Sequence, residues 1–215
     1  MAMLSEPAEA DTTEADTQER VLVVAERLFR EIGYQKTTVA DIAKLLRMSP
    51  ANVYRFFSSK DAIRQGVACR LMGEVEAAAR TIVAGHEPAV ERLRHLLASV
   101  HRMNTERYVG DAKLHEMVAS AMEEDWAVCK AHIECITMLI AEVIADGMAE
   151  GVFRLADVRI AALCTCTAML RFFHPQMIAQ TANKPGPTLD QMIDFTLAGL
   201  GYAIESGSAN ARRGS

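Results

Sequence analysis

Hydrophobic positions along most of this 215-residue chain recur at the spacing of an α-helix. Within residues 37–46, the side chains of Val39, Ile42, Ala43 and Leu46 fall at i, i+3, i+4 and i+7, which places them on one face of a short helix. Longer stripes of the same period predict helices at about 21–32, 59–84, 93–103, 126–149, 160–173 and 189–204. No stretch alternates as a strand does, so the pattern predicts an all-α protein.

A second short helix is predicted directly after the first. Ser49 is suited to the N-cap, because its hydroxyl can accept a hydrogen bond from a free backbone N–H, and Pro50 suits the first helical position. Val53 then faces inward with one or both of Phe56 and Phe57. Two short helices joined by a turn of three or four residues form a helix-turn-helix.

Several residues around this motif occur together at characteristic spacings. They are Phe29-x-x-x-Gly33-Tyr34-x-x-Thr37-Thr38, Ile42-Ala43, Ser49, and Tyr54-x-x-Phe57-x-x-Lys60-x-x-Ile63. This set resembles the DNA-binding domain of the TetR family of bacterial transcriptional regulators, over roughly residues 20 to 64. One position departs from the family, which usually has glycine where this chain has Arg47. A positive φ at Arg47 would strain the turn by about 1 kcal/mol.

The resemblance implies roles for individual residues. Thr38, Ser49, Tyr54 and Lys60 are expected to hold phosphates, and Pro50, Ala51, Asn52 and Arg55 to face the bases of double-stranded operator DNA. It also implies a larger helical domain that binds a small-molecule effector, and a homodimer formed through the last two helices. Repression is the commoner mode in the family.

Charge is distributed unevenly along the chain. The formal net charge is −5, but residues 1–16 carry five acids and no base, whereas residues 17–64 carry nine Lys or Arg against five acids. A basic helix-turn-helix suits phosphate binding, although a cluster of charges is also typical of an ordinary solvated surface. We predict a disordered acidic arm at 1–16, a DNA-binding domain at 17–64, an effector-binding and dimerisation domain at 65–205, and a disordered tail at 206–215.

Two late helices are candidates for the dimer interface. Residues 160–173 are apolar nearly all round, and small residues near position 200 allow another helix to approach closely. The candidate interface residues are Leu163, Leu170, Leu197, Ala198, Leu200 and Gly201. The same residues would also suit the core of a single chain.

The middle helices combine apolar side chains with a few polar tips, which is the mixture that small-molecule pockets use. The residues are His101, Met103, Tyr108, His115, Met117, Trp126, Cys129, His132 and Ile133. A plain core is the alternative, since Met and aromatic residues at helical spacing usually pack together. If the pocket exists, a hydrophobic or amphipathic effector fits it best.

The sequence gives little support for metal binding, catalysis or membrane insertion. Cys129, His132 and Cys135 offer two ligands on one helix face, too few for a metal site. No nucleophile motif or phosphate loop occurs, so we expect neither an enzyme nor a cofactor. No apolar run spans a bilayer and no secretory signal is apparent, which favours the cytoplasm. The alternative function is an effector-independent, nucleoid-type DNA-binding protein whose C-terminal domain serves only for dimerisation.

Overall fold

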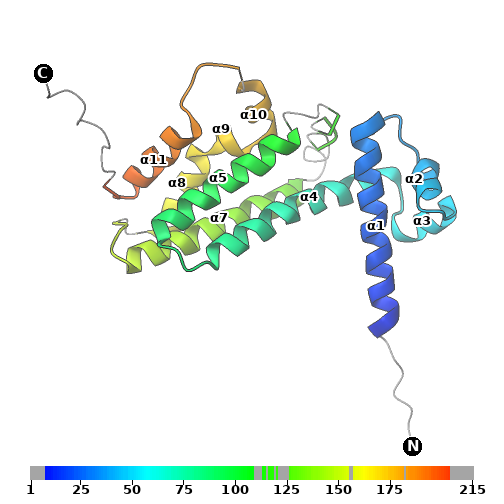
Figure 1. The fold of residues 1–215 in the computed structure, drawn as a ribbon, viewed down its shortest axis with the longest axis horizontal. Helices are drawn as coiled ribbons and strands as arrows, with labels where there is room; N and C mark the ends of the chain where they lie inside the picture. Colours follow the sequence, from blue (N-terminus) through cyan, green and yellow to red (C-terminus); the bar gives the residue numbers. More distant parts are fainter. Residues whose placement is uncertain are drawn as a thin grey trace, which may run out of the picture. The chain divides into compact units, whose positions relative to one another are not determined.

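The computed structural model describes residues 8–108, 113–114, 116–118, 120, 126–154, 157–181 and 183–203, and the regular structure within these ranges is entirely helical. The all-α prediction is therefore confirmed (Figure 1). The chain divides into two compact units. The first joins residues up to 74 with 106–132, and the second joins 75–105 with the residues from 133 onward. This division differs from the predicted boundary between residues 64 and 65.

The first unit is built around three N-terminal helices. They are α1 (Ala8–Ile32), α2 (Val39–Leu45) and α3 (Pro50–Phe56). The first half of α4 (Lys60–Val83) follows, with the end of α5 (Ala89–Tyr108) and the start of α7 (Trp126–Ala149). Helix α2 lies against both α1 and α3, as Figure 1 shows.

The core of the first unit draws on sequence far beyond the helix-turn-helix. Phe29 of α1, Ile42 of α2, Val53 of α3 and Ile63 of α4 are all fully buried in one cluster. Leu114, Met117 and Val118, which are helical, are buried in that same cluster. The DNA-binding part of the chain is thus completed by residues that follow α5.

Helix α1 begins earlier than the sequence predicts. The segment 1–16 was expected to be a disordered arm, but α1 starts at Ala8, so residues 8–16 are helical. Residues 8–16 include Ala8, Ala10 and Ala15, and alanine has the highest helix propensity of all residues. Extending a helix that is already formed also costs little, because nucleation is the expensive step. Residues 1–7 and the predicted tail 206–215 lie outside the described residues.

Gly33 ends α1 as the sequence predicts. Its φ is +92°, a left-handed conformation that glycine adopts at no steric cost. Its N–H donates to the carbonyl of Phe29, and its own carbonyl accepts from the N–H and the hydroxyl of Thr37. The chain therefore turns sharply from α1 toward α2.

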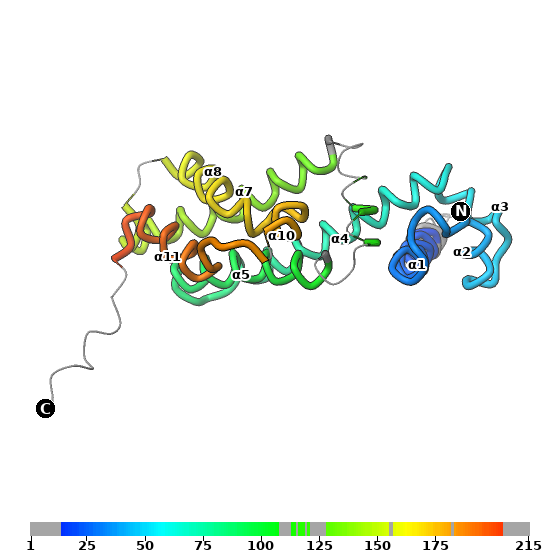
Figure 2. Tube along the Cα trace, turned by 90° about the horizontal axis from the view of Figure 1, so that it is seen from above, coloured from blue at the N-terminus to red at the C-terminus, as the bar shows by residue number. Residues whose placement is uncertain are grey.

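The second unit is a helical bundle. The rest of α4, α5 and α7 runs side by side, as the two views of Figures 1 and 2 agree. Shorter helices follow: α8 (Val158–Ala168), α9 (Leu170–Phe173), α10 (Pro175–Thr181) and α11 (Leu189–Gly199). One cluster joins buried residues of α4, α5, α7, α8 and α11. Within the described residues, no helix has the length and apolar character needed to cross a membrane.

Candidate DNA-binding surface

Helix α2 is fixed at its start by a capping box. The Thr38 hydroxyl accepts from the N–H of Asp41 at 3.2 Å and donates to the Asp41 carboxylate at 2.6 Å, and the Thr38 N–H donates to the same carboxylate. These hydrogen bonds lower the pKa of Asp41 from its ordinary 3.8. Since the folded pKa is the lower one, the cap stabilises the fold above about pH 3.8 and is lost as the pH falls further.

The turn between α2 and α3 contains a strained residue. Arg47 has a φ of +55°, so the positive φ that would strain this turn is present. A Cβ atom in this left-handed region clashes with the backbone, which glycine avoids. The turn is therefore strained, and the side chain of Arg47 is exposed on it.

Replacing Arg47 by glycine is expected to stabilise the protein by about 1 kcal/mol, because it removes the strain of the left-handed conformation. The measurement is the free energy of unfolding in urea. Arg47→Ala is the matched control, since it removes the same side chain but keeps the Cβ atom. An equal gain from both variants would show that the arginine side chain, and not the backbone strain, is unfavourable.

Helix α3 has one buried and one exposed face. Ser49 is its N-cap, with the hydroxyl accepting from the N–H of Asn52 at 3.2 Å, and Pro50 takes the first helical position. Val53 is fully buried and anchors the helix on the core. Ser49, Pro50, Ala51, Tyr54 and Arg55 are exposed, and Asn52 is half-buried with its amide near the Met48 sulfur. Six predicted residues therefore lie on or beside one accessible helix.

The exposure of Tyr54 decides between its two interpretations. The side chain is 51% exposed, so it does not belong to the core. Its position one turn from Pro50 leaves the phenol accessible to a phosphate or a base edge.

Lys60 has a more structural role than the sequence indicates. Its ammonium donates to the carbonyls of Tyr34 at 3.0 Å and Thr37 at 3.1 Å, and more weakly to that of Gln35. It also lies 4.3 Å from the centre of the Tyr34 ring, a cation–π contact. Lys60 therefore holds the turn between α1 and α2 in this structure. A phosphate contact would have to share the ammonium with these acceptors.

Basic side chains accompany this surface. Lys36, Lys44, Arg47 and Arg55 are exposed and lie on α2, on α3 and in the turns before them. Asp41, the acid nearest to them in sequence on α2, is engaged in the capping box. The positive charge is thus available where a phosphate backbone would pass.

The predicted dimer residues do not share one environment. Leu163 is 45% exposed and Leu170 is 50% exposed, whereas Leu197 is fully buried. Leu200 is buried too, and both Leu197 and Leu200 pack into the core of their own chain, which is the alternative that the sequence left open for these residues. Ala198 and Gly201 are exposed.

Two exposed apolar residues on these helices were missed. Phe195 on α11 is 69% exposed, and Ile160 on α8 is also exposed. Helices α8 and α11 contact each other, and both carry exposed apolar side chains. We name these exposed residues the α8–α11 face; they are Ile160 and Leu163 on α8, Leu170 at the start of α9, and Phe195 and Ala198 on α11.

The predicted effector-pocket residues are not gathered into one described cavity. Met117 is buried in the core of the first unit, Cys129 packs with Ala68 and Met72 in another cluster, and Met103 packs on the core of the second unit. Ile133 is exposed and His132 half-buried. Met117 and Cys129 thus belong to different clusters, and a pocket that both would line stays a prediction. The side chains of Tyr108, His115 and Trp126 lie outside the described residues.

His101 serves the fold of the second unit. Its Nδ1 lies 2.9 Å from the carbonyl oxygen of Phe172, and its ring meets the Phe172 ring edge to face. Asn104 donates to the carbonyl of Phe173, so α5 holds the last carbonyls of α9. Among the described residues, no three His, Cys, Asp or Glu side chains gather as metal ligands would, and the five cysteines are free thiols.

A capped and exposed second helix, set by a tight turn on a helical unit with basic surface residues, defines a helix-turn-helix DNA-binding protein. Two family descriptions match the chain: "Bacterial regulatory proteins, tetR family" over residues 21–67, and "Tetracyclin repressor-like, C-terminal domain" over residues 89–188. The chain belongs to the TetR family. It is a DNA-binding transcriptional regulator and not an enzyme.

Similar proteins include two curated regulators. YhgD of Bacillus subtilis, described as an uncharacterized HTH-type transcriptional regulator, is 24% identical over 91% of this chain and 98% of its own length. UidR of Escherichia coli K12, an HTH-type transcriptional regulator, is 25% identical over 65% of this chain and 70% of its own.

A solved structure has a similar fold. It is FadR of Thermus thermophilus, a transcriptional repressor crystallised with lauroyl-CoA, which matches with a TM-score of 0.58 at 24% identity and covers 92% of this chain and 100% of that one.

Proposed function

We propose that the protein is a dimeric repressor that binds a palindromic operator and is released from it by a small hydrophobic or amphipathic molecule. The observation that carries the DNA-binding part is the accessible face of α3, with Arg55 and Tyr54 exposed and the helix start fixed by Ser49. A rigid cap and a buried Val53 fix the helix on its domain, so that its exposed residues can enter a major groove as a unit.

The dimer part of the proposal rests on the α8–α11 face. An apolar face of this kind is typical of a surface that another chain covers. A two-fold contact would bring two helices from each chain together in a four-helix arrangement. The two α3 helices of such a dimer would then read half-sites about one DNA turn apart, roughly 34–36 Å.

Arg55 and Lys60 are expected to act differently on DNA. The probe is the duplex that the wild-type protein selects from a randomised pool. Arg55→Ala should weaken binding to this duplex by about 1–3 kcal/mol and leave binding to random DNA nearly unchanged, because a base contact is lost. Asn52→Ala should behave alike. Lys60→Ala should weaken binding to both DNAs to a similar extent.

Binding isotherms on the selected duplex and on random DNA provide the measurement. Lys44→Ala, an exposed lysine on α2, is the control for the loss of one positive charge. The division of roles would be wrong if Lys60→Ala changed the sequence preference while Arg55→Ala did not. A wild type that bound both DNAs equally would instead favour the nucleoid-type alternative.

The effector is supported by family membership, and the FadR of T. thermophilus carries an amphipathic molecule. A thermal-shift screen of hydrophobic compounds, followed by release assays on the selected duplex, tests this part. Release requires that a compound bind the two conformations with different affinity, not merely that it bind. If no stabilising compound released the duplex, the effector-independent alternative would be favoured.

A further inference from the structure

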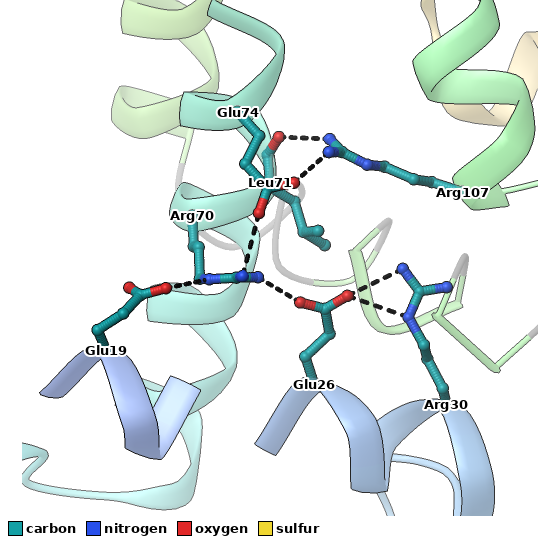
Figure 3. Close-up of polar contacts among 7 residues, drawn as sticks. All are labelled: Glu19, Glu26, Arg30, Arg70, Leu71, Glu74 and Arg107. Atoms are coloured by element: carbon teal, nitrogen blue, oxygen red, sulfur yellow. Dashed lines mark hydrogen bonds and ion pairs between the residues drawn. The ribbon is translucent and has the colours of Figure 1, made fainter. Parts of the chain in front are cut away.

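A chain of alternating charges joins three helices of the first unit (Figure 3). Arg30 pairs with Glu26 on α1 at 2.9 Å, Glu26 pairs with Arg70 on α4 at 2.5 Å, and Arg70 pairs with Glu74 at 3.1 Å. Glu74 in turn accepts from Arg107 at the end of α5. We call these five residues the ion chain.

Arg70 is the centre of the ion chain. Besides Glu26 and Glu74, it donates to Glu19 on α1 at 2.6 Å, so its guanidinium holds α1 at two carboxylates nearly two turns apart (Figure 3). Burial lowers the pKa of Arg70, but the hydrogen bond to Glu19 and the charges of Glu74 and Glu26 outweigh this and raise it. The guanidinium stays charged, and each of its three nitrogens pairs with a different carboxylate: Nε with Glu19, Nη1 with Glu26 and Nη2 with Glu74.

Arg107 joins the ion chain from the end of α5, the helix that follows α4. Its guanidinium donates to the carbonyl of Leu71 at 2.6 Å as well as to Glu74. Leu71 is buried in the core of the first unit, so this contact ties the end of α5 to the buried side of α4. Arg107 lies within the stretch 89–188 that matches the C-terminal family description, yet its contacts are made in the first unit.

We propose that Arg107 is a positioning residue for DNA binding, because it occupies Glu74 and thereby leaves Arg70 to hold α1. The proposal rests on the DNA-binding function of the first unit. Without Arg107, the Glu74 carboxylate has only Arg70 to pair with inside the ion chain. It then draws the guanidinium away from Glu19 and Glu26, and α1 loosens. Since α2 packs on α1, the helix-turn-helix loses its fixed support.

Arg107→Gln is expected to speed hydrogen exchange of the backbone amides of α1 between residues 14 and 30. It should also weaken binding to the selected duplex roughly tenfold, the size of effect that coupled charge networks usually give. Adding Glu74→Gln should restore most of both losses, because an uncharged side chain no longer competes for Arg70. A residue with a merely structural contact would not be rescued by removing its partner.

The matched control is Arg94→Gln. Arg94 also lies on α5 and also pairs with a carboxylate, that of Asp194 at 2.5 Å, but in the second unit. It should leave exchange of α1 and affinity for the duplex unchanged. Should Arg107→Gln fail to fold, Arg107→Lys, which keeps the charge but offers a single donor group, should show a smaller loosening of α1.

Two results would overturn the proposal. One is equal behaviour of Arg107→Gln and Arg94→Gln, and the other is a double variant that remains as loose and as weak as Arg107→Gln alone. The exchange measurement needs no DNA, so it tests the ion chain even if the wild type selects no duplex. That last outcome would count against the proposed function instead.

Discussion

Phe195→Glu is expected to convert the proposed dimer into monomers and to abolish specific DNA binding. Phe195 is 69% exposed in the single chain and lies on the α8–α11 face with Leu163 and Leu170. A glutamate there would place an unpaired charge in an apolar contact, which costs several kcal/mol for each buried ion. Since two linked half-site contacts bind far better than one, affinity for the palindromic duplex should fall by about 10²–10⁴.

Sedimentation velocity and circular dichroism check this result together. The variant should sediment as a monomer and keep its helical signal, because Phe195 makes little contact with its own chain. Met138→Glu is the matched control: Met138 is 71% exposed on α7, outside the α8–α11 face, and should stay dimeric. A Phe195→Glu protein that sedimented like the wild type would place the interface elsewhere.

A glutamate at Leu197, two residues further along α11, is expected to disrupt the fold and not only the dimer. Its side chain is fully buried in the second unit, so Leu197→Glu should unfold that unit and lose helical signal. The pair of variants thus separates loss of the dimer from loss of the fold.

Met117→Ala should destabilise the first unit by about 2–5 kcal/mol, the usual cost of truncating a buried methionine. Met117 is 2% exposed and shares a core with residues of all four N-terminal helices. Because that core supports α3, binding to the selected duplex should be lost at temperatures well below the wild-type melting point. A residue that only lined a ligand pocket would show neither effect.

Urea unfolding measures the loss of stability, and a duplex-binding assay at increasing temperature measures the loss of binding. Met138→Ala is the control, since truncating an exposed methionine opens no cavity. An unchanged free energy of unfolding in Met117→Ala would mean that Met117 does not contribute to the core of the first unit.

The helix-turn-helix could be predicted from the sequence because its signals are local. The cap at Ser49, the proline after it and the glycine at position 33 all lie within a turn of the feature they determine. The structure has these elements where the pattern indicates them. At Arg47 the resemblance raised the question of a left-handed turn, because the family usually has glycine there, but the sign of φ came from the structure.

The environment of longer-range residues could not be predicted in this way. On α11, periodicity marks Ile193, Leu197 and Leu200 as one stripe, but it does not say whether the same chain or a partner covers that stripe. The informative signal was the residue outside the stripe: a large aromatic side chain at position 195, on the face that periodicity assigns to solvent.

Met117 and Cys129 illustrate a second limit of sequence patterns. Both are buried apolar side chains at helical spacing, as a pocket wall would be, and yet they pack in two different clusters. Which cluster a side chain joins depends on the tertiary path of the chain. The ion chain escaped notice for a similar reason, because only its Glu26–Arg30 and Arg70–Glu74 pairs lie four residues apart.

The completion of the first core by Leu114, Met117 and Val118 has a consequence for synthesis. As the chain leaves the ribosome, its first 90 or so residues already contain the whole helix-turn-helix but lack these three buried side chains. We expect this nascent segment to be marginally stable and to acquire DNA affinity only after the residues around 118 have emerged. A ribosome-stalled chain ending shortly after α4 should therefore be sensitive to protease, whereas one extended past α7 should resist it.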